Sequence, residues 1–216
     1  MTKRIFITGI GTGVGKTVVS ACVTEALQAD YWKPVQAGTE EGTDTQTIQS
    51  LISNKLTVCH KEAYCLEMPA SPHLAARAEG ITIDAGLIAR LADNLQPEQR
   101  SLVIEGAGGL LVPLNDTVFT ADLIRTLNAG VIIVAQNYLG SINHSLLTAR
   151  ELQRTGVRVI GWIFGGERNS NEDDIVRWSG FPKIGRIPQT ATLSPDFVRQ
   201  QAQLLSAPLN TLLNDH

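Results

Sequence analysis

The sequence predicts an α/β fold, with a single domain over residues 1–216 that contains a doubly wound, mostly parallel sheet and helices on both faces. Apolar runs of strand length alternate with helix-like segments, and parallel strands need a covering helix between them. With 216 residues and 43% hydrophobic content, the chain can bury one substantial core. A glycine-rich loop joins the first strand directly to the first helix. We therefore expect the functional residues at the carboxyl ends of the strands.

The expected strands are short apolar runs bounded by glycine, proline or polar residues. They cover residues 5–7, 31–35, 102–104, 130–135, 157–164 and 183–187. The expected helices cover residues 17–27, 45–53, 83–94, 120–127, 142–154 and a terminal segment. Asp84 and Ser194 are expected N-caps, and Pro195 occupies the first position of the terminal helix. Residues 54–73 are the least regular part, and we expect a loop near the site there.

The loop after the first strand reads Gly9-Ile10-Gly11-Thr12-Gly13-Val14-Gly15-Lys16-Thr17. Glycines let successive backbone N–H groups point into one anion-binding hollow, and the following helix adds the positive end of its dipole. Lys16 supplies a charge for the outer phosphates, and the Thr17 hydroxyl suits Mg²⁺. Ile10 stands where the common motif has its first glycine. A purely structural turn would not explain Lys16 and Thr17 at a helix start, so the loop predicts nucleotide binding and a P-loop NTPase-like fold.

Composition points to small-molecule partners. The net charge of −3 and pI near 5.8 argue against nucleic-acid binding. No apolar run approaches a membrane span, and residues 5–7 are too few for a signal-peptide core, so we expect a cytoplasmic protein. Three cysteines, Cys22, Cys59 and Cys65, are expected to be buried reduced thiols. A metal cluster that includes His60 is the weaker alternative.

Two acids and a lysine stand at expected strand ends. Glu105 directly follows a wholly apolar strand, where a carboxylate faces the nucleotide crevice and can reach a metal ion. Asp44 is, from its position alone, an ordinary loop acid. Lys33 interrupts an apolar and aromatic strand, either as a snorkelling edge lysine or as a second cation that neutralises charge during phosphoryl transfer.

Two further polar residues allow more than one interpretation. His73, in Ser71-Pro72-His73, has no visible nucleophile partner, so we expect a structural or orienting role. Asn143 begins a helix after Gly140-Ser141. A helix N-terminus there could hold a substrate carboxylate or could simply be capped.

Several short motifs follow the loop in a fixed order: Lys33-Pro34-Val35, Ser71-Pro72-His73, Glu105-Gly106-Ala107-Gly108-Gly109 and Leu139-Gly140-Ser141-Ile142-Asn143-His144. By these motifs the chain resembles the dethiobiotin synthetases over nearly its whole length. The resemblance implies an ATP- and Mg²⁺-dependent ligase that inserts CO₂ between the two amines of 7,8-diaminononanoate. In that family a carbamate forms, the γ-phosphoryl group is transferred to it, and the second amine displaces phosphate to close the ureido ring.

The resemblance also implies roles for individual residues. The catalytic residues would be Lys33 and Lys16. The nucleotide site would comprise Gly13, Val14, Gly15, Lys16, Thr17, Val18, Asp44, Glu105, Gly106, Ala107, Gly108, Gly165, Gly166, Pro188, Gln189 and Thr190. The Mg²⁺ ligands would be Thr17, Asp44 and Glu105. The diamine site would comprise Thr12, Lys33, Ala37, Gly108 and Asn143. In a homodimer, Asn143 would act across the subunit interface.

Three positions depart from the family pattern. Ala37 replaces a Ser or Thr near the substrate, and Gly11 replaces an acid. Gly165 replaces an Asn that reads adenine. Because glycine has no amide to pair with a base edge, we expect ATP, CTP, GTP and UTP to be used with efficiencies within about tenfold of one another, which corresponds to about 1.4 kcal/mol.

Two other classes share a related loop. Partitioning and positioning ATPases are switches that carry an additional lysine early in the loop, where this chain has Gly11. Amidoligases of cobalamin synthesis join a similar nucleotide half to a glutaminase domain, for which 216 residues leave no room. We therefore expect a ligase of the dethiobiotin synthetase type, with the switch ATPase as the alternative.

Overall fold

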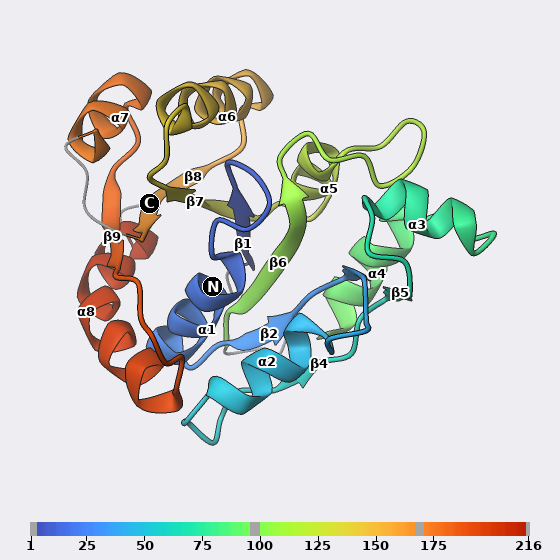
Figure 1. Ribbon diagram of the computed structural model, residues 1–216, viewed down its shortest axis with the longest axis horizontal. Coiled ribbons are helices and arrows are strands. Elements are labelled where there is room, and N and C mark those ends of the chain that lie inside the picture. Colours follow the sequence, from blue (N-terminus) through green and yellow to red (C-terminus); the bar gives the residue numbers. More distant parts are fainter. Residues whose placement is uncertain (1–3, 96–99, 167–170, 215–216) are drawn as a thin grey trace.

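The computed structural model describes residues 4–95, 100–166 and 171–214, and its centre is a seven-stranded sheet, which can be followed in Figure 1. The strands are β1 (Arg4–Gly9), β2 (Asp30–Trp32), β3 (Val35–Ala37), β4 (Cys59–His60), β5 (Tyr64–Leu66), β6 (Leu102–Gly109), β7 (Gly130–Gln136), β8 (Val159–Gly165) and β9 (Lys183–Ile187). The strand order is β4-β2-β6-β1-β7-β8-β9, and every neighbouring pair is parallel. The predicted α/β class is confirmed.

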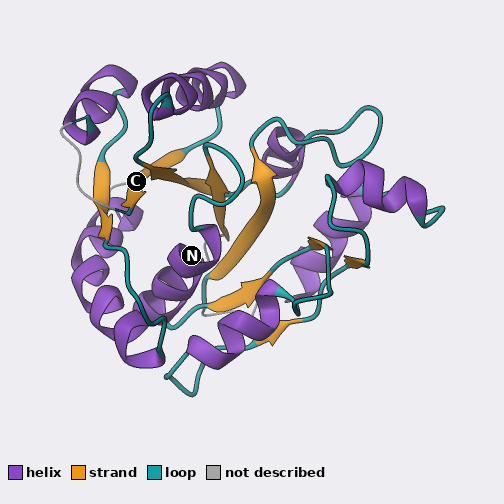
Figure 2. Cartoon of the chain, viewed as in Figure 1, coloured by secondary structure: helices purple, strands orange, loops and turns teal. Residues whose placement is uncertain are grey.

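Helices cover the sheet in two layers (Figure 2). The helices are α1 (Lys16–Leu27), α2 (Asp44–Leu51), α3 (Pro72–Ala78), α4 (Ala85–Leu95), α5 (Thr120–Thr126), α6 (Ser141–Thr155), α7 (Glu172–Ser179) and α8 (Pro195–Asn214). One layer packs α2 and α8 against α1, and the other packs α4, α5, α6 and α7 in sequence. Because both faces are covered, the central strands are apolar throughout; Ile5, Phe6 and Ile7 of β1 have no exposed surface.

The strand expected over residues 31–35 is two strands in two sheets. The main-sheet strand β2 ends at Trp32. Pro34 has no N–H to continue the ladder, and the chain leaves the main sheet there. The next strand, β3, pairs with β5 in a separate two-stranded sheet. Lys33 therefore lies at the point where the chain passes from one sheet to the other.

The prediction of a loop over residues 54–73 is wrong in part. This segment contains β4 and β5, and α3 begins at Pro72. Strands of two and three residues are too short to show a periodic pattern. Helix α7 was also not predicted, because its sequence is largely polar. The strand predicted over residues 102–104 also extends further, to Gly109, so the prediction that Glu105 directly follows this strand is wrong: Glu105 lies within it. The remaining elements match the predictions to within a few residues, and the Ser194 cap is present, since Ser194 Oγ accepts a 3.2 Å hydrogen bond from Phe197 N–H.

The thiols only partly match expectation. Cys22 is buried, Cys59 is half-buried and Cys65 is exposed, so the prediction of burial is wrong for Cys65. Across the described ranges, no group of three or more His, Cys, Asp or Glu side chains is arranged to hold a metal ion, which leaves the cluster around His60 without support.

None of the described helices combines the length and the apolar character needed to cross a membrane.

Candidate active site

The glycine-rich loop connects β1 to α1 with a backbone that only some of its residues can adopt easily. Gly13 and Gly15 have φ of 73° and 89°, which is the left-handed region that favours glycine. Ile10, by contrast, is buried, and its N–H donates to Val134 O at 3.0 Å. This packing against β7 accounts for an apolar residue where the common motif has glycine. Lys16 Nζ donates to Gly11 O at 3.0 Å, so the lysine lies along the loop.

Helix α2 places Asp44 at this loop. Thr43 and Gln46 form a capping box, in which Thr43 Oγ1 accepts from Gln46 N–H and Gln46 Oε1 accepts from Thr43 N–H. Gln36, on β3, accepts from the Asp44 N–H at 3.2 Å. These bonds fix Asp44 in the first turn of α2. Its carboxylate oxygen Oδ1 lies 2.8 Å from Thr17 Oγ1.

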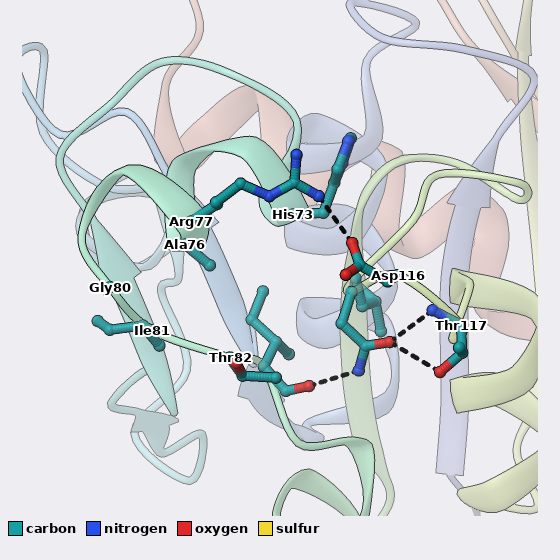
Figure 3. Close-up of a pocket in the computed structure, with 11 residues that line it drawn as sticks. His73, Ala76, Arg77, Gly80, Ile81, Thr82, Asp116 and Thr117 are labelled. Carbon is teal, nitrogen blue, oxygen red and sulfur yellow. Dashed lines mark hydrogen bonds and ion pairs between the residues drawn. The ribbon is translucent and has the colours of Figure 1, made fainter.

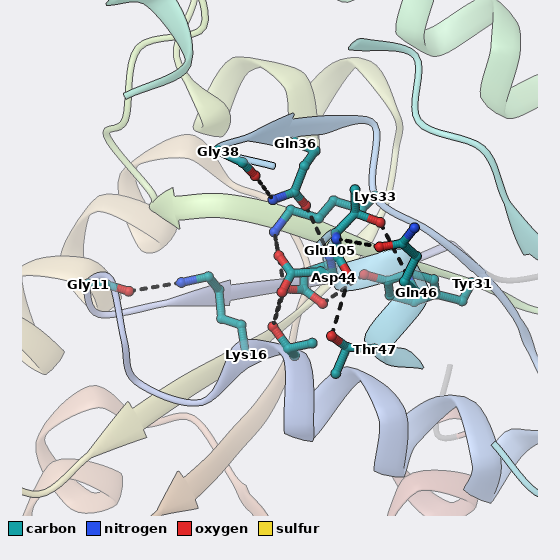
Figure 4. Close-up of polar contacts among 12 residues, drawn as sticks. Gly11, Lys16, Tyr31, Lys33, Gln36, Gly38, Asp44, Gln46, Thr47 and Glu105 are labelled. Atoms are coloured by element: carbon teal, nitrogen blue, oxygen red, sulfur yellow. Dashed lines mark hydrogen bonds and ion pairs between the residues drawn. The ribbon is translucent and has the colours of Figure 1, made fainter. Parts of the chain in front are cut away.

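Glu105, near the middle of β6, completes this arrangement (Figure 4). It pairs in register with Ile7 of β1 and is 1% exposed. Its Oε1 lies 2.9 Å from Thr17 Oγ1, and its Oε2 accepts a 2.9 Å hydrogen bond from the Tyr31 phenol. Tyr31, which the sequence analysis did not identify, thus holds one carboxylate oxygen and leaves the other facing Thr17.

Lys33 lies between the two carboxylates. Its Nζ donates to Asp44 Oδ2 and lies 3.5 Å from Glu105 Oε1. Burial disfavours the charged form of Lys33, but the Glu105 and Asp44 carboxylates favour it more strongly, so the pKa of Lys33 is raised. Burial lowers the pKa of Lys16, with Glu105 opposing that shift. An anionic phosphate beside Lys16 would favour its charged form.

The oxygen groups of Thr17, Asp44 and Glu105 fit Mg²⁺. Magnesium usually takes one or two carboxylates and completes its shell with water and phosphate oxygens. Two carboxylates and a hydroxyl that converge within 2.9 Å supply such a set. A bound Mg²⁺ would neutralise charge on the phosphates of a nucleotide at the loop.

These groups line a cavity of about 680 Å³. Its walls include Thr12, Gly13, Gly15, Lys16, Thr17, Val18, Lys33, Ala37, Asp44, Glu105, Ala107 and Gly108, all predicted site residues. They also include Gln36, Ser71 and Val112, which were not in the predicted site. Ser71 Oγ lies 3.1 Å from His73 Nδ1, so His73 orients a hydroxyl on the cavity wall.

A second hollow of about 310 Å³ begins at the same loop. The predicted residues Gly13, Val14, Gly15, Val18, Gly165, Gly166, Pro188, Gln189 and Thr190 line it. Two predicted residues line neither space. Gly106 packs against Phe6, where an added Cβ would lie 2.7 Å from the ring. Asn143 is exposed in the first turn of α6.

A third hollow of about 510 Å³ lies between α3 and residues 114–117 (Figure 3). An exposed ion pair between Arg77 and Asp116, 2.7 Å long, crosses it. His73 lines this hollow, whereas Ser71 and Pro72 line the 680 Å³ cavity, so the start of α3 separates the two. None of the nucleotide, metal or diamine residues predicted from sequence lies here.

Comparisons with known proteins agree with this geometry. Residues 3–196 match the model of a family described as an AAA domain. The chain is 54% identical over 201 residues to the ATP-dependent dethiobiotin synthetase BioD of Cytophaga hutchinsonii, with 93% of this chain and 95% of the relative covered. It is 46% identical over 205 residues to the BioD protein of Christiangramia forsetii, with 94% and 96% covered.

Solved structures with the same fold are more distant in sequence. The septum site-determining protein MinD of Pyrococcus horikoshii, complexed with Mg-ADP, aligns with a TM-score of 0.63 and 13% identity, covering 100% of this chain and 97% of that one. A ParA family ATPase from Chlorobium tepidum aligns with a TM-score of 0.59 and 15% identity, covering 100% and 99%. At such identities the likeness concerns the fold alone.

Proposed function

The chain belongs to the ATP-dependent dethiobiotin synthetase family, and we propose that it carboxylates 7,8-diaminononanoate with CO₂ and closes the ring to give dethiobiotin, ADP and phosphate. The observation that carries this proposal is the convergence of Lys16, Lys33, Asp44 and Glu105 on one cavity beside the phosphate loop. A switch ATPase needs the loop and its metal. It does not need a second buried lysine at a cavity large enough for a small substrate.

The reaction needs charge stabilisation more than acid–base chemistry. One amine of the diamine attacks the CO₂ carbon and loses a proton, and a carbamate oxygen then takes the γ-phosphoryl group while ADP leaves. The second amine attacks the same carbon and loses a proton, and phosphate leaves as the ring closes. Negative charge develops on oxygen in each step, and fixed cations stabilise it. Lys33 is buried and held in its charged form by Glu105 and Asp44, so it suits the carbamate and the transferred group.

The phosphate loop and the Mg²⁺ ligands would bind different parts of the metal–nucleotide complex. Backbone N–H groups from Gly13 to Val18 would hold the triphosphate, with Lys16 at its outer end. Thr17, Asp44 and Glu105 would hold Mg²⁺, and the 310 Å³ hollow would take the base.

The diamine would occupy the remaining part of the 680 Å³ cavity. Thr12, Ala37 and Gly108 line it, and Ala37 offers no hydroxyl there. Asn143, exposed at the start of α6, would contribute from the second subunit of a homodimer and hold the substrate carboxylate at a helix N-terminus. The enzyme would work in the cytoplasm.

The test is incorporation of labelled bicarbonate into a cyclic urea. Purified protein, ATP and Mg²⁺ should fix label only when 7,8-diaminononanoate is present, with one ADP formed per ring. Omission of the diamine is the matched control. ATP hydrolysis that ignores the diamine and yields no labelled ring would contradict the proposal and favour the switch ATPase.

A further inference from the structure

The 310 Å³ hollow and the 680 Å³ cavity meet at the phosphate loop, since both are lined by Gly13, Gly15 and Val18. A nucleotide with its phosphates on this loop can extend its sugar and base into either of these spaces. The two lysines and two carboxylates occupy the larger cavity. The base therefore belongs in the smaller hollow, at the carboxyl ends of β7, β8 and β9.

The smaller hollow offers few side chains that can read a base. Its walls are largely apolar, with Ile187, Leu193 and Phe197 among them. Gly165 and Gly166 bring no side chain. Among the described residues that line the hollow, hydrogen-bonding side chains come from Gln136, Gln189 and Thr190.

Two of these three are poorly suited to the task. Thr190 Oγ1 donates to Thr192 O at 2.9 Å and accepts from Thr192 N–H at 3.2 Å, so its hydroxyl is engaged. Gln189 is exposed, and its amide competes with water. Gln136 is half-buried at the end of β7 and remains the best-placed amide.

The Gln136 side chain lies beside two glycines, Gly165 and Gly166, which have no side chains to fill the space around it. It pairs in register with Gly165 of β8. A Cβ on Gly166 would lie 3.4 Å from the Gln136 Cγ and 3.6 Å from its Nε2. Within the described part of the chain, no hydrogen bond holds the Gln136 amide. The amide can therefore rotate and present its donor and acceptor in either order.

We propose that Gln136 is the side chain that pairs with the nucleotide base, and that its free rotation makes it accept all four bases. Adenine and cytosine present an amino donor beside a ring-nitrogen acceptor. Guanine and uracil present a carbonyl acceptor beside an N–H donor. A side-chain amide that flips about its terminal bond matches either edge. The kcat/KM values for ATP, CTP, GTP and UTP therefore lie within about tenfold of one another. This inference rests on the proposed function, because it assumes a triphosphate on the loop.

Gln136→Glu provides the sharpest test. The variant replaces a donor and an acceptor with two acceptors. Guanine presents two adjacent donors, its N1–H and its amino group, and both fit a carboxylate, whereas adenine and cytosine turn a ring-nitrogen acceptor toward it and uracil has a single N–H between two carbonyls. In kcat/KM measurements, the wild type should show the flat profile, and Gln136→Glu should favour GTP over ATP, CTP and UTP by about tenfold or more. Gln136→Met, of similar shape, should lower all four alike. A Gln136 with only a structural role would give a uniform loss in both variants, which would overturn the proposal.

Two controls separate the causes. Gln203→Glu adds the same charge on an exposed part of α8 and should leave the profile flat. Gln189→Glu tests the other amide in the hollow, and a base-dependent profile there but not at Gln136 would overturn the assignment. A wild-type preference for ATP beyond a hundredfold would also overturn it.

Binding of ADP, CDP, GDP and UDP, measured by thermal shift without the diamine, separates this inference from the proposed reaction. The same Gln136→Glu ranking without dethiobiotin formation would sink the reaction and support the base-reading role. Dethiobiotin formation with a uniform Gln136→Glu profile would support the proposed reaction and overturn the base-reading role.

Discussion

Two groups of charged side chains, each centred on a buried glutamate, lie on opposite sides of β1 in the sheet order. The first, the phosphate-end cluster, consists of Lys33, Asp44 and Glu105 with Thr17 and Tyr31. The second, the edge cluster, consists of Glu172, Lys183 and Arg186 with Asn137. Glu105 is 1% exposed and Glu172 is 2% exposed, so burial alone does not tell them apart.

The clusters differ in whether their carboxylates face a cavity. In the edge cluster, the Glu172 carboxylate accepts from Lys183 at 2.7 Å, Arg186 at 3.0 Å and Asn137 at 3.2 Å. It lines none of the three hollows described above. The phosphate-end cluster faces the 680 Å³ cavity, and its carboxylates share one hydroxyl. A buried ion pair contributes little net stability. The edge cluster therefore fixes α7 against β9, whereas the phosphate-end cluster is arranged to receive a ligand.

Replacement of Lys33 should show the difference between the two clusters most strongly. Lys33→Ala removes a cation that acts as charge moves during transfer, and should lower kcat by a hundredfold or more, since such a contact is worth about 3 kcal/mol. Thermal stability should fall as well, because Glu105 and Asp44 lose the buried cation between them. Single-turnover measurement of labelled ring formation checks this.

Lys183→Ala is the matched control in the edge cluster. It should cost about 1 kcal/mol of unfolding free energy, because Glu172 keeps Arg186 as a partner. Its kcat should equal that of the wild type. Near-normal turnover in Lys33→Ala, or a large loss in Lys183→Ala, would contradict the division of roles.

The next largest effect should follow loss of a metal ligand. Asp44→Asn and Glu105→Gln should each raise the Mg²⁺ concentration needed for half-maximal activity by about tenfold or more, because a hard cation depends on charged oxygens. Binding of Mn²⁺ with ADP, followed by electron paramagnetic resonance, gives a readout apart from activity. Unchanged metal responses in both variants would show that these carboxylates are not the ligands.

Tyr31→Phe should have a smaller effect on the same property. The phenol fixes one Glu105 oxygen at 2.9 Å, and burial followed by the Glu105 charge keeps its pKa well above the usual value, so it remains a donor. Groups that orient metal ligands affect metal affinity by about tenfold or more. We expect a tenfold weaker Mn²⁺ affinity with little change in the KM for the diamine. An equal loss in both quantities would indicate general damage to the fold.

The smallest effect should appear only in the pH dependence of stability. Burial alone would raise the pKa of Glu172, but the hydrogen bonds from Lys183 and Arg186 outweigh it and lower the pKa. A lowered folded-state pKa means that Glu172 stabilises the protein above its unfolded pKa, near 4.3, and that this stability is lost as pH falls through the folded value. Glu172→Gln should therefore flatten the acid side of the stability curve in urea titrations. An acid side as steep as that of the wild type would remove Glu172 as its cause.

The sequence predicted those parts of the molecule whose cause is local. The loop, the helix starts at Ser194 and Asp84, and the apolar strands all follow from neighbouring residues. Lys33 and Glu105 were identified from their places at expected strand ends and Asp44 chiefly from the resemblance, and the fold brings the three together although Glu105 lies within β6.

The residues that were missed depend on pairing between distant strands. Tyr31 in a short aromatic strand reads as core, and only its register beside β6 places its phenol at Glu105. Gln136 ends a strand, as many polar residues do, and its proposed role depends on Gly165, its register partner in β8, and on Gly166, which follows that strand. The sequence indicated that the chain leaves the strand at Pro34. It did not show that β3 pairs with β5, because strands of three residues carry no periodic pattern.

The carbonyl of Pro34 has a further consequence. It accepts N–H bonds from Ala63 at 3.0 Å and Tyr64 at 2.9 Å, and so attaches the small β3–β5 sheet to the end of β2. Two three-residue strands held in this way form a cooperative unit weaker than the seven-stranded sheet. In native-state hydrogen exchange, the amides of β3 and β5 should exchange through a partial opening, well below the free energy at which those of β1 exchange. Such an opening would release Gln36 and Ala37 from the cavity wall, and would loosen one side of the site without disturbing the seven-stranded sheet.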